Sequence, residues 1–158
     1  MRERGDWRGS ASRPVTHYTL SVNPLLRALL AIYPALAPWV EEHPEIPAEV
    51  IAAAERHDVP AELMMAVCYT ESRLGSDAST ELTCGVYRVP RARQADAAAH
   101  ALARWRTHCH SWRGSLRMFR GGRCNSPDPR GYVPRVLRLA ERLRVRAESC
   151  GAGSGPCE

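Results

Sequence analysis

Apolar residues recur along this chain at the spacing of α-helices. The clearest helix is expected from about Pro60 to Gly75, because proline suits a first helical turn and glycine suits the C-terminal end. Four residues at helical spacing form its core-facing stripe: Leu63, Val67, Thr70 and Leu74. Glu71 falls on the flank of this stripe, a position that would suit the wall of a pocket.

The same pattern predicts five further helices. They are expected at 24–33, 47–57, 91–107, 111–121 and 133–148, with Ser111 as an N-cap and Gly121 as a terminator. The last three have apolar faces: Ala95, Ala98, Leu102 and Trp105; then Trp112, Leu116 and Phe119; then Val133, Val136, Leu137, Ala140 and Leu143. The segment 76–90 is predicted to be a loop with a short strand at "GVYRV", and "GGRCNSPDPRG" a second loop.

These elements indicate one mainly α-helical domain at 47–147. A flexible arm is expected at 1–23, a short helix with a proline-rich connector at 24–46, and a flexible tail at 148–158. The chain of 158 residues is long enough for one such domain.

Charge affects the partner that we expect. The net charge of +5 comes from arginine alone, since the chain contains no lysine, and it favours anionic partners. In the last helix, however, the arginines lie opposite the apolar stripe, as on any solvent-facing side: Arg135, Arg138, Arg142 and Arg146. Nucleic acid is therefore not the partner that we expect.

Six cysteines allow several disulfide pairings, and sequence alone does not choose among them. Cys68 shares the helix of Glu71 and is interpreted as a small buried apolar residue. The pairs Cys109 with Cys124 and Cys150 with Cys157 flank loop-like stretches, so we expect a disulfide in at least one of them.

One group of potential metal ligands lies near the end of the helix at 91–107: His100, His108, Cys109 and His110. The run His108-Cys109-His110 lacks the ligand spacing of known zinc sites. We therefore expect a solvated helix end, with neither a metal nor a cofactor.

The most apolar stretch is "LLRALLAIYPALAPWV", residues 25–40. Its Ala35-Leu36-Ala37 imitates a signal cleavage site, but Arg27 interrupts the apolar run and two prolines break it. We expect a short helix packed onto the domain, with no integral membrane segment and no convincing signal peptide.

Residues 49–90 resemble the catalytic core of the lytic transglycosylase domain of the lysozyme superfamily, which is related to goose-type lysozyme. That family has a helix, a turn ending in proline, an apolar helix ending in Glu-Ser, a loop with Ala-x-Ser, and Gly-Leu-Met-Gln-x-x-Pro. Here "IAAAERHDVPAELMMAVCYTESRLGSDAS" and "CGVYRVP" supply these parts in order. "SLRMFRGG" and "GYVPRVLRLAERL" resemble later family segments, so the resemblance covers about residues 47–147.

The resemblance implies a lysozyme-like fold of goose type with at most a small vestigial β element. It implies that Glu71 cleaves the MurNAc-GlcNAc β-1,4 bond of peptidoglycan, first as acid and then as base, and leaves a 1,6-anhydro product without a second carboxylate. The implied substrate-binding residues are Ser72, Tyr87, Arg88, Phe119, Arg120 and Tyr132. Three pairs depart from the family pattern: Leu82-Thr83 for Gly-Ala, Tyr87-Arg88 for Met-Gln and Phe119-Arg120 for Tyr-Asn.

The chemistry explains why a carboxyl group would lie among apolar residues. Cleaving a glycosidic bond needs a proton donor for the leaving oxygen, and apolar burial is what lets a carboxyl group hold a proton near neutral pH. The alternative interpretation of Glu71 is a helix residue paired with Arg73 or Arg88. If Asp77 or Glu81 activated a water, the outcome would be hydrolysis.

Other interpretations remain open for the site and for the protein. Ser72 could simply bond its own helix backbone, and Tyr87 and Tyr132 could be packing residues. A catalytically inactive relative that binds peptidoglycan is the competing class. We expect a monomer whose substrate lies outside the cytoplasm, as for a phage or mobile-element protein of bacterial origin.

Overall fold

The computed structural model of the chain describes residues 23–77, 83–86 and 88–151. These residues form seven α-helices and one 3-10 helix, with no strand among them. The elements are α2 (Pro24–Ile32), η1 (Pro34–Leu36), α3 (Ala37–Glu42), α4 (Glu45–Arg56), α5 (Ala61–Ser72), α6 (Arg91–Cys109), α7 (Trp112–Gly121) and α8 (Tyr132–Gly151). The mainly α class is confirmed, whereas the described residues of 85–89 form bends and a turn in place of the expected strand. Most of the expected arm and tail lies outside the described residues.

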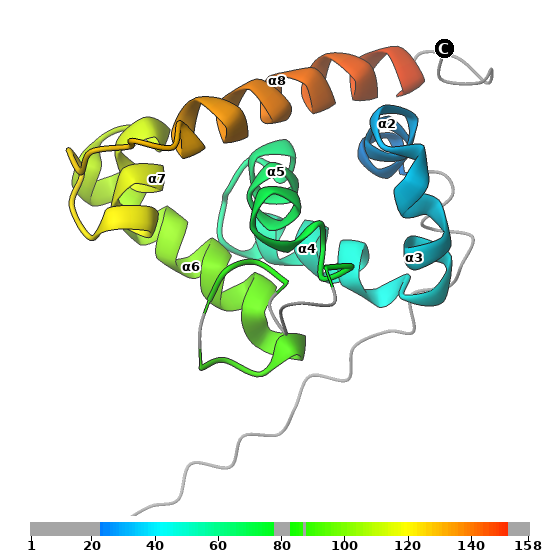
Figure 1. Cartoon of the computed structure of the whole chain (residues 1–158), viewed down its shortest axis with the longest axis horizontal. Helices are drawn as coiled ribbons and strands as arrows, with labels where there is room; N and C mark the ends of the chain where they lie inside the picture. Colours follow the sequence, from blue (N-terminus) through cyan, green and yellow to red (C-terminus); the bar gives the residue numbers. More distant parts are fainter. Residues whose placement is uncertain (1–22, 78–82, 87, 152–158) are drawn as a thin grey trace, which may run out of the picture.

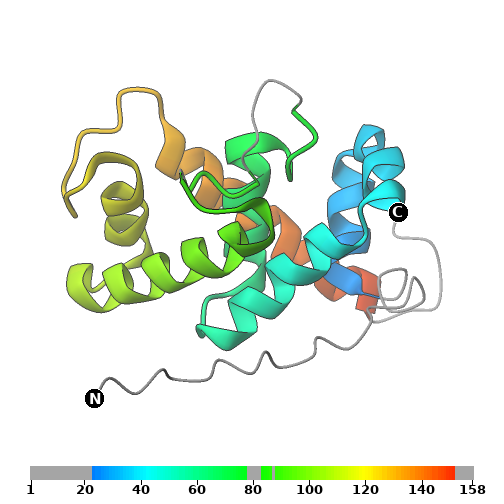
Figure 2. The ribbon, with the colours of Figure 1, turned by 90° about the horizontal axis from the view of Figure 1, so that it is seen from below.

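Helix α5 runs through the middle of the molecule, between α4 and the long helix α8 (Figure 1). Seen from below, α4 and α6 cross in contact on the near side (Figure 2). Every residue of α5 from Leu63 to Cys68 is buried, so the helix is covered on all sides. Such all-round burial is typical of a core helix, and it is broader than the one-sided stripe that the sequence predicts. Glu71 therefore belongs to the last turn of the most enclosed helix.

The C-terminal end of α5 differs from the sequence prediction. The helix ends at Ser72, and the next two residues, Arg73 and Leu74, have positive φ angles of 52° and 60°. Gly75 follows with a φ of 81°, and its carbonyl oxygen accepts a hydrogen bond of 2.8 Å from the guanidinium of Arg91. A Cβ atom at Gly75 would meet only the end of that flexible side chain, so the positive φ is the stronger reason for glycine at this position.

The connector expected at 34–46 is largely helical, which corrects the prediction. Pro34 lies in the first turn of η1 and Pro38 in the first turn of α3, where a missing N–H is harmless. The indole N–H of Trp39 in α3 donates to the carbonyl oxygen of Leu74 at 3.1 Å. The two prolines thus begin helices, and this segment contacts the end of α5.

Helix α7 has the boundaries that the sequence predicts. Ser111 caps it, with its hydroxyl accepting from the backbone N–H of Gly114 at 2.9 Å. Gly122, with a φ of 78°, ends it one residue after the expected terminator. A disulfide between Cys109 and Cys124 ties the end of α6 to the loop after α7, as expected.

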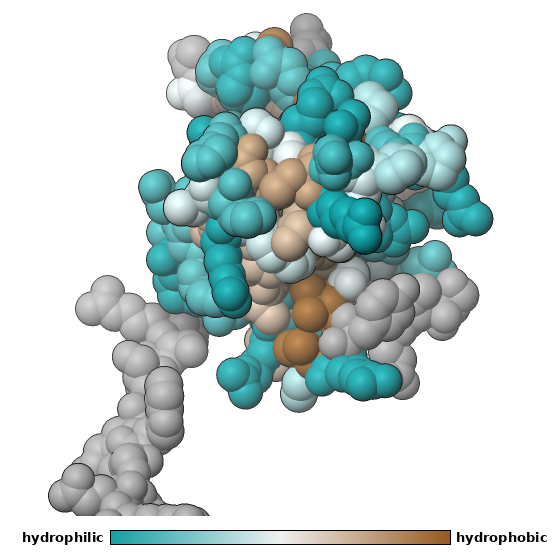
Figure 3. Space-filling view, turned by 90° about the vertical axis from the view of Figure 1, so that its left-hand side faces the viewer, coloured by the Kyte–Doolittle hydropathy of each residue, from teal (hydrophilic) through white to brown (hydrophobic). Residues whose placement is uncertain are grey.

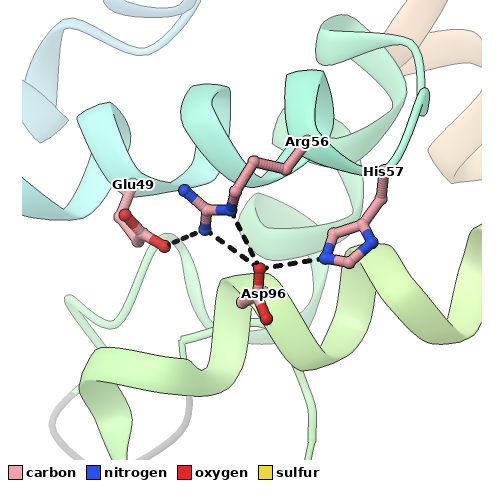
Figure 4. Close-up of polar contacts among 4 residues, drawn as sticks. All are labelled: Glu49, Arg56, His57 and Asp96. Atoms are coloured by element: carbon pink, nitrogen blue, oxygen red, sulfur yellow. Dashed lines mark hydrogen bonds and ion pairs between the residues drawn. The ribbon is translucent and has the colours of Figure 1, made fainter. Parts of the chain in front are cut away.

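A cluster of charged and polar residues joins α4 to α6, and we call it the Asp96 cluster: Glu49, Arg56, His57 and Asp96 (Figure 4). Asp96 Oδ1 lies 2.9 Å from His57 Nε2 and 3.1 Å from Arg56 Nε. Partial burial raises the pKa of Asp96, but the bonds from His57 and Arg56 outweigh this and hold the pKa below its usual value. The cluster therefore links the two helices through a carboxylate that stays ionised.

The face of the described part that is shown in Figure 3 is mostly hydrophilic. On the side that carries α7, a band of paler and brown residues runs between hydrophilic flanks (Figure 3). Among the described residues, no helix combines the length and the apolar character that crossing a bilayer requires. The same residues contain no group of His, Cys, Asp and Glu side chains able to hold a metal ion, and the ring of His100 instead contacts that of His57.

Candidate functional site

The candidate site is built around the carboxyl group of Glu71, in the last turn of α5. Only 10% of this side chain is exposed. Its Oε1 atom is buried and has no hydrogen-bond partner among the described residues. Its Oε2 atom lies 3.9 Å from a guanidinium nitrogen of Arg120, a long ion pair that leaves the carboxyl group unclamped. Its cationic neighbour is thus Arg120, and no ion pair joins it to Arg73 or Arg88.

Tyr132, the first residue of α8, faces Glu71. Its hydroxyl is buried and also lacks a hydrogen-bond partner in the described part of the chain. Burial raises the pKa of Tyr132 and the Glu71 carboxylate raises it further, while Arg120 and Arg135 oppose the shift. The two groups therefore interact electrostatically, although their geometry falls short of a hydrogen bond. The Arg120 guanidinium lies 5.3 Å from the centre of the Tyr132 ring and completes the group.

The position of Tyr132 is fixed by the start of its helix. The carboxylate of Asp128 accepts hydrogen bonds of 2.8 Å from the backbone N–H groups of Tyr132 and Val133. These are donors in the first turn, which have no partner within the helix and attract an acidic residue. Asp128 thus anchors the end of α8 that delivers Tyr132 to the site.

A disulfide between Cys68 and Cys84 brings the loop after α5 against Glu71. This corrects the interpretation of Cys68 as a small buried apolar residue without a bridge. That interpretation considered only the helix around Cys68, whereas its partner lies in the loop that follows the helix. Gly85 then lies so close to Glu71 that an added Cβ would be 2.7 Å from the carboxyl carbon. Its φ of 76° also favours glycine. The backbone at Gly85 therefore forms one wall of the site.

Two buried polar side chains hold the same loop. The Ser72 hydroxyl donates to the carbonyl oxygen of Thr83 at 2.7 Å and accepts from the N–H of Gly75 at 2.8 Å. The Gln94 side chain on α6 accepts from the N–H of Thr83 at 2.6 Å and donates to the carbonyl oxygen of Val89 at 3.2 Å. Ser72 thus bonds the loop that faces Glu71, with no hydrogen bond to the carboxyl group itself.

Gln94 and the Cys68–Cys84 bridge are the positioning groups that sequence reasoning missed. A weak signal for Gln94 exists in the sequence, since it directly precedes the first inward alanine of α6. A polar side chain on a buried face needs partners, and here it finds them in the loop. No comparable signal identifies the partner of Cys68, because pairing depends on the tertiary structure.

Two other predicted residues that the structure describes, Arg88 and Phe119, make no ion pair or hydrogen bond with Glu71. Arg88 is exposed, has a φ of 62°, and makes no ion pair with a described residue. The ring of Phe119 packs edge-on against Trp105 of α6, with centroids 6.0 Å apart. Tyr87, like Glu81, lies outside the described residues. Among the described residues that were predicted to bind substrate, Arg120 and Tyr132 are therefore the two that interact electrostatically with the Glu71 carboxyl group.

Glu71 is absent from the described lining of both of the following cavities. One, of about 180 Å³, lies between the start of α5, Trp112 and α8. The other, of about 530 Å³, lies between the end of α5, Tyr33 and α8. Comparisons of the chain with protein-family models, with curated proteins and with solved structures each found no match.

Proposed function

We propose that this protein cleaves the glycan strands of peptidoglycan, with Glu71 as the acid and base. The observation that carries the proposal is the pair of buried polar atoms, Glu71 Oε1 and the Tyr132 hydroxyl, for which no described residue supplies a hydrogen bond of good geometry. Burying polar atoms without partners costs stability, so their presence at one place favours a functional role. The order of sequence motifs around Glu71 supports the same role.

The proposed reaction needs one carboxyl group. Glu71 donates its proton to the glycosidic oxygen and then, as a carboxylate, accepts a proton from the C6 hydroxyl of N-acetylmuramic acid. That hydroxyl oxygen closes on C1 and gives the 1,6-anhydro product. Gly85, Arg120 and Tyr132 lie beside the Glu71 carboxyl group, and none of these three is a second acid, which supports this route. Arg120 would stabilise the carboxylate formed after the first step.

The test is the clearing of purified peptidoglycan by wild type and by Glu71→Gln. Loss of a general acid should slow clearing by about a hundredfold or more. Glu55→Gln serves as the matched control, because Glu55 is an exposed glutamate of α4 outside the site. Clearing by Glu71→Gln at the wild-type rate would refute the catalytic role. No clearing by the wild type would favour the inactive, peptidoglycan-binding relative.

Mass spectrometry of the digest separates the two enzymatic outcomes. The proposed transglycosylase gives 1,6-anhydro-muramic ends, whereas a lysozyme-like hydrolase gives reducing ends with one added water. A hydrolytic product would require a water-activating acid, for which Asp77 is the described candidate. Asp77→Asn would then abolish product formation, while the transglycosylase would be unaffected.

A further inference from the structure

The larger cavity is strongly basic. It is lined by residues of α5 and α8, with Tyr33 completing the wall: Tyr33, Tyr69, Thr70, Arg73, Arg135, Arg138, Leu139 and Arg142. Four arginines therefore line one cavity of about 530 Å³, and its described lining includes no acidic residue. We call these four residues the arginine cluster. A cavity of this size is typical of sites for small molecules.

None of the four guanidinium groups forms an ion pair with a described carboxylate. Arginines elsewhere do so, as Arg144 does with Glu141 and Glu148 on the same helix. Arg138 and Arg142 lie one turn apart on α8, a spacing at which like charges destabilise a helix. The arginine cluster is thus an arrangement of positive charge that the described part of the protein leaves unbalanced.

The lining of the cavity also includes two aromatic side chains, Tyr33 and Tyr69. The rings of Tyr33 and Tyr69 stack, with centroids 4.1 Å apart and planes 18° apart. Burial raises the pKa of Tyr69 and Tyr33 raises it further, whereas Arg73 lowers it, so this guanidinium lies within electrostatic reach of the Tyr69 hydroxyl. The cavity therefore combines a flat, partly apolar wall with several strong hydrogen-bond donors.

We propose that this cavity binds a small ligand that carries two or more oxyanion groups, phosphate or carboxylate. Arg135 and Arg142 are seven residues apart, which is about 10 Å along a helix, so a single anion would engage only part of the cluster. Guanidinium groups bind both kinds of oxyanion through paired, charge-assisted hydrogen bonds. The stacked tyrosines would contact the uncharged body of the ligand. This proposal does not depend on the catalytic role of Glu71.

Isothermal titration calorimetry of the full chain tests the proposal with two probes, inorganic tripolyphosphate and citrate, which separate phosphate from carboxylate recognition. We expect one site per chain whose affinity falls as salt rises. The triple variant Arg135→Gln, Arg138→Gln and Arg142→Gln should bind at least about tenfold more weakly. Failure of both probes to bind at millimolar concentration would overturn the proposal.

The matched control is the triple variant Arg93→Gln, Arg104→Gln and Arg113→Gln. It removes the same number of positive charges from exposed arginines outside the cavity, so it should bind within about twofold of wild type. Equal weakening of binding in both triple variants would mean that the probes are attracted by the overall charge of the protein, and it would refute the proposal. If the cavity triple does not fold, Arg138→Gln alone gives the same comparison against Arg104→Gln.

Two further arms separate this proposal from its competitors. The first arm measures binding of a single-stranded oligonucleotide. If it binds more tightly than tripolyphosphate, and equally to both triple variants, the positive charge serves nucleic-acid binding and the cavity site is contradicted. Glu71→Gln should bind tripolyphosphate as the wild type does. A loss of binding in Glu71→Gln would show that the anions occupy the Glu71 site, whereas failure of glycan cleavage alone leaves the cavity proposal standing.

Discussion

Alanine in place of Gly85 is the sharpest test of how the site is built. Gly85 has a φ of 76°, and a Cβ atom there would lie 2.7 Å from Cγ, Cδ and Oε2 of Glu71. Gly122 provides a matched control, because it has a nearly equal φ of 78° and an added Cβ there would have no atom of another described residue within 4 Å. Gly85→Ala and Gly122→Ala should therefore have the same cost of placing alanine at a positive φ, and only Gly85→Ala adds a close contact with Glu71.

The magnitudes follow from these two contributions. An L-residue in the left-handed region costs about 1–2 kcal/mol, and this applies to both positions. At Gly85 the Glu71 carboxyl group must also rotate away from its rotamer, which costs about 1 kcal/mol more. We therefore expect Gly122→Ala to lower the free energy of unfolding by about 1–2 kcal/mol. Gly85→Ala should lower it by about 2–3 kcal/mol.

Urea unfolding followed by tryptophan fluorescence measures both changes. A third variant, Glu71→Ala with Gly85→Ala, removes the side chain that the new Cβ would meet. In the Glu71→Ala background, the cost of Gly85→Ala should fall to that of Gly122→Ala. Equal losses for the two single glycine variants would refute the close contact, as would an unchanged cost in the Glu71→Ala background.

Three more outcomes follow from the structure. Asp96→Asn should lower the free energy of unfolding at pH 7 by about 1 kcal/mol, a value discounted because Asp96 is 45% exposed. Since its pKa is lowered by folding, this stabilisation is present above the ordinary value of 3.8 and is lost as the pH falls below it, so urea midpoints of variant and wild type should converge in acid. Replacing Cys68 and Cys84 by alanine should lower the free energy of unfolding by about 3 kcal/mol, which thermal unfolding measures. The same change should slow glycan clearing, because the loop at Gly85 is released. Tyr132→Phe should change stability by less than about 0.5 kcal/mol, since its hydroxyl has no hydrogen bond of good geometry to a described residue, but should slow clearing.

Each of these has an outcome that contradicts it. The Cys109–Cys124 disulfide closes a loop of similar length, so its replacement by alanine should cost similar stability without slowing clearing. Equal loss of clearing in both cysteine variants would contradict a specific role of the Cys68–Cys84 disulfide at the site. A parallel pH dependence in Asp96→Asn and wild type would exclude that carboxylate as the titrating group. A large destabilisation by Tyr132→Phe would mean that its hydroxyl is bonded in the native protein.

Local sequence signals predicted most helices because those signals act over a few residues. The cap at Ser111 and the apolar stripe of α8 needed no knowledge of distant neighbours. The connector was predicted wrongly because proline was interpreted as a breaker, whereas Pro34 and Pro38 begin helices. The all-round burial of α5 was also missed, since it arises from helices that come together only in the folded chain.

The candidate site could be predicted in part for the same reason. Motif order pointed to Glu71, Arg120 and Tyr132, and the structure gives these three residues mutual interactions. The Cys68–Cys84 bridge and the bonds of Gln94 depend on contacts between separate elements, and a single sequence does not specify those.

Because Arg73 has a left-handed backbone conformation, a substitution that stabilises the fold at this position would also weaken ligand binding by the basic cavity. Glycine at this position would relieve about 1 kcal/mol of backbone strain, so a screen for more thermostable variants would select Arg73→Gly. The same exchange would take one of the four guanidinium groups from the wall of the basic cavity. Selection for thermal stability alone would then enrich variants that carry glycine at position 73 and bind oxyanions weakly. Such an outcome would indicate that the arginine is kept for binding and not for stability.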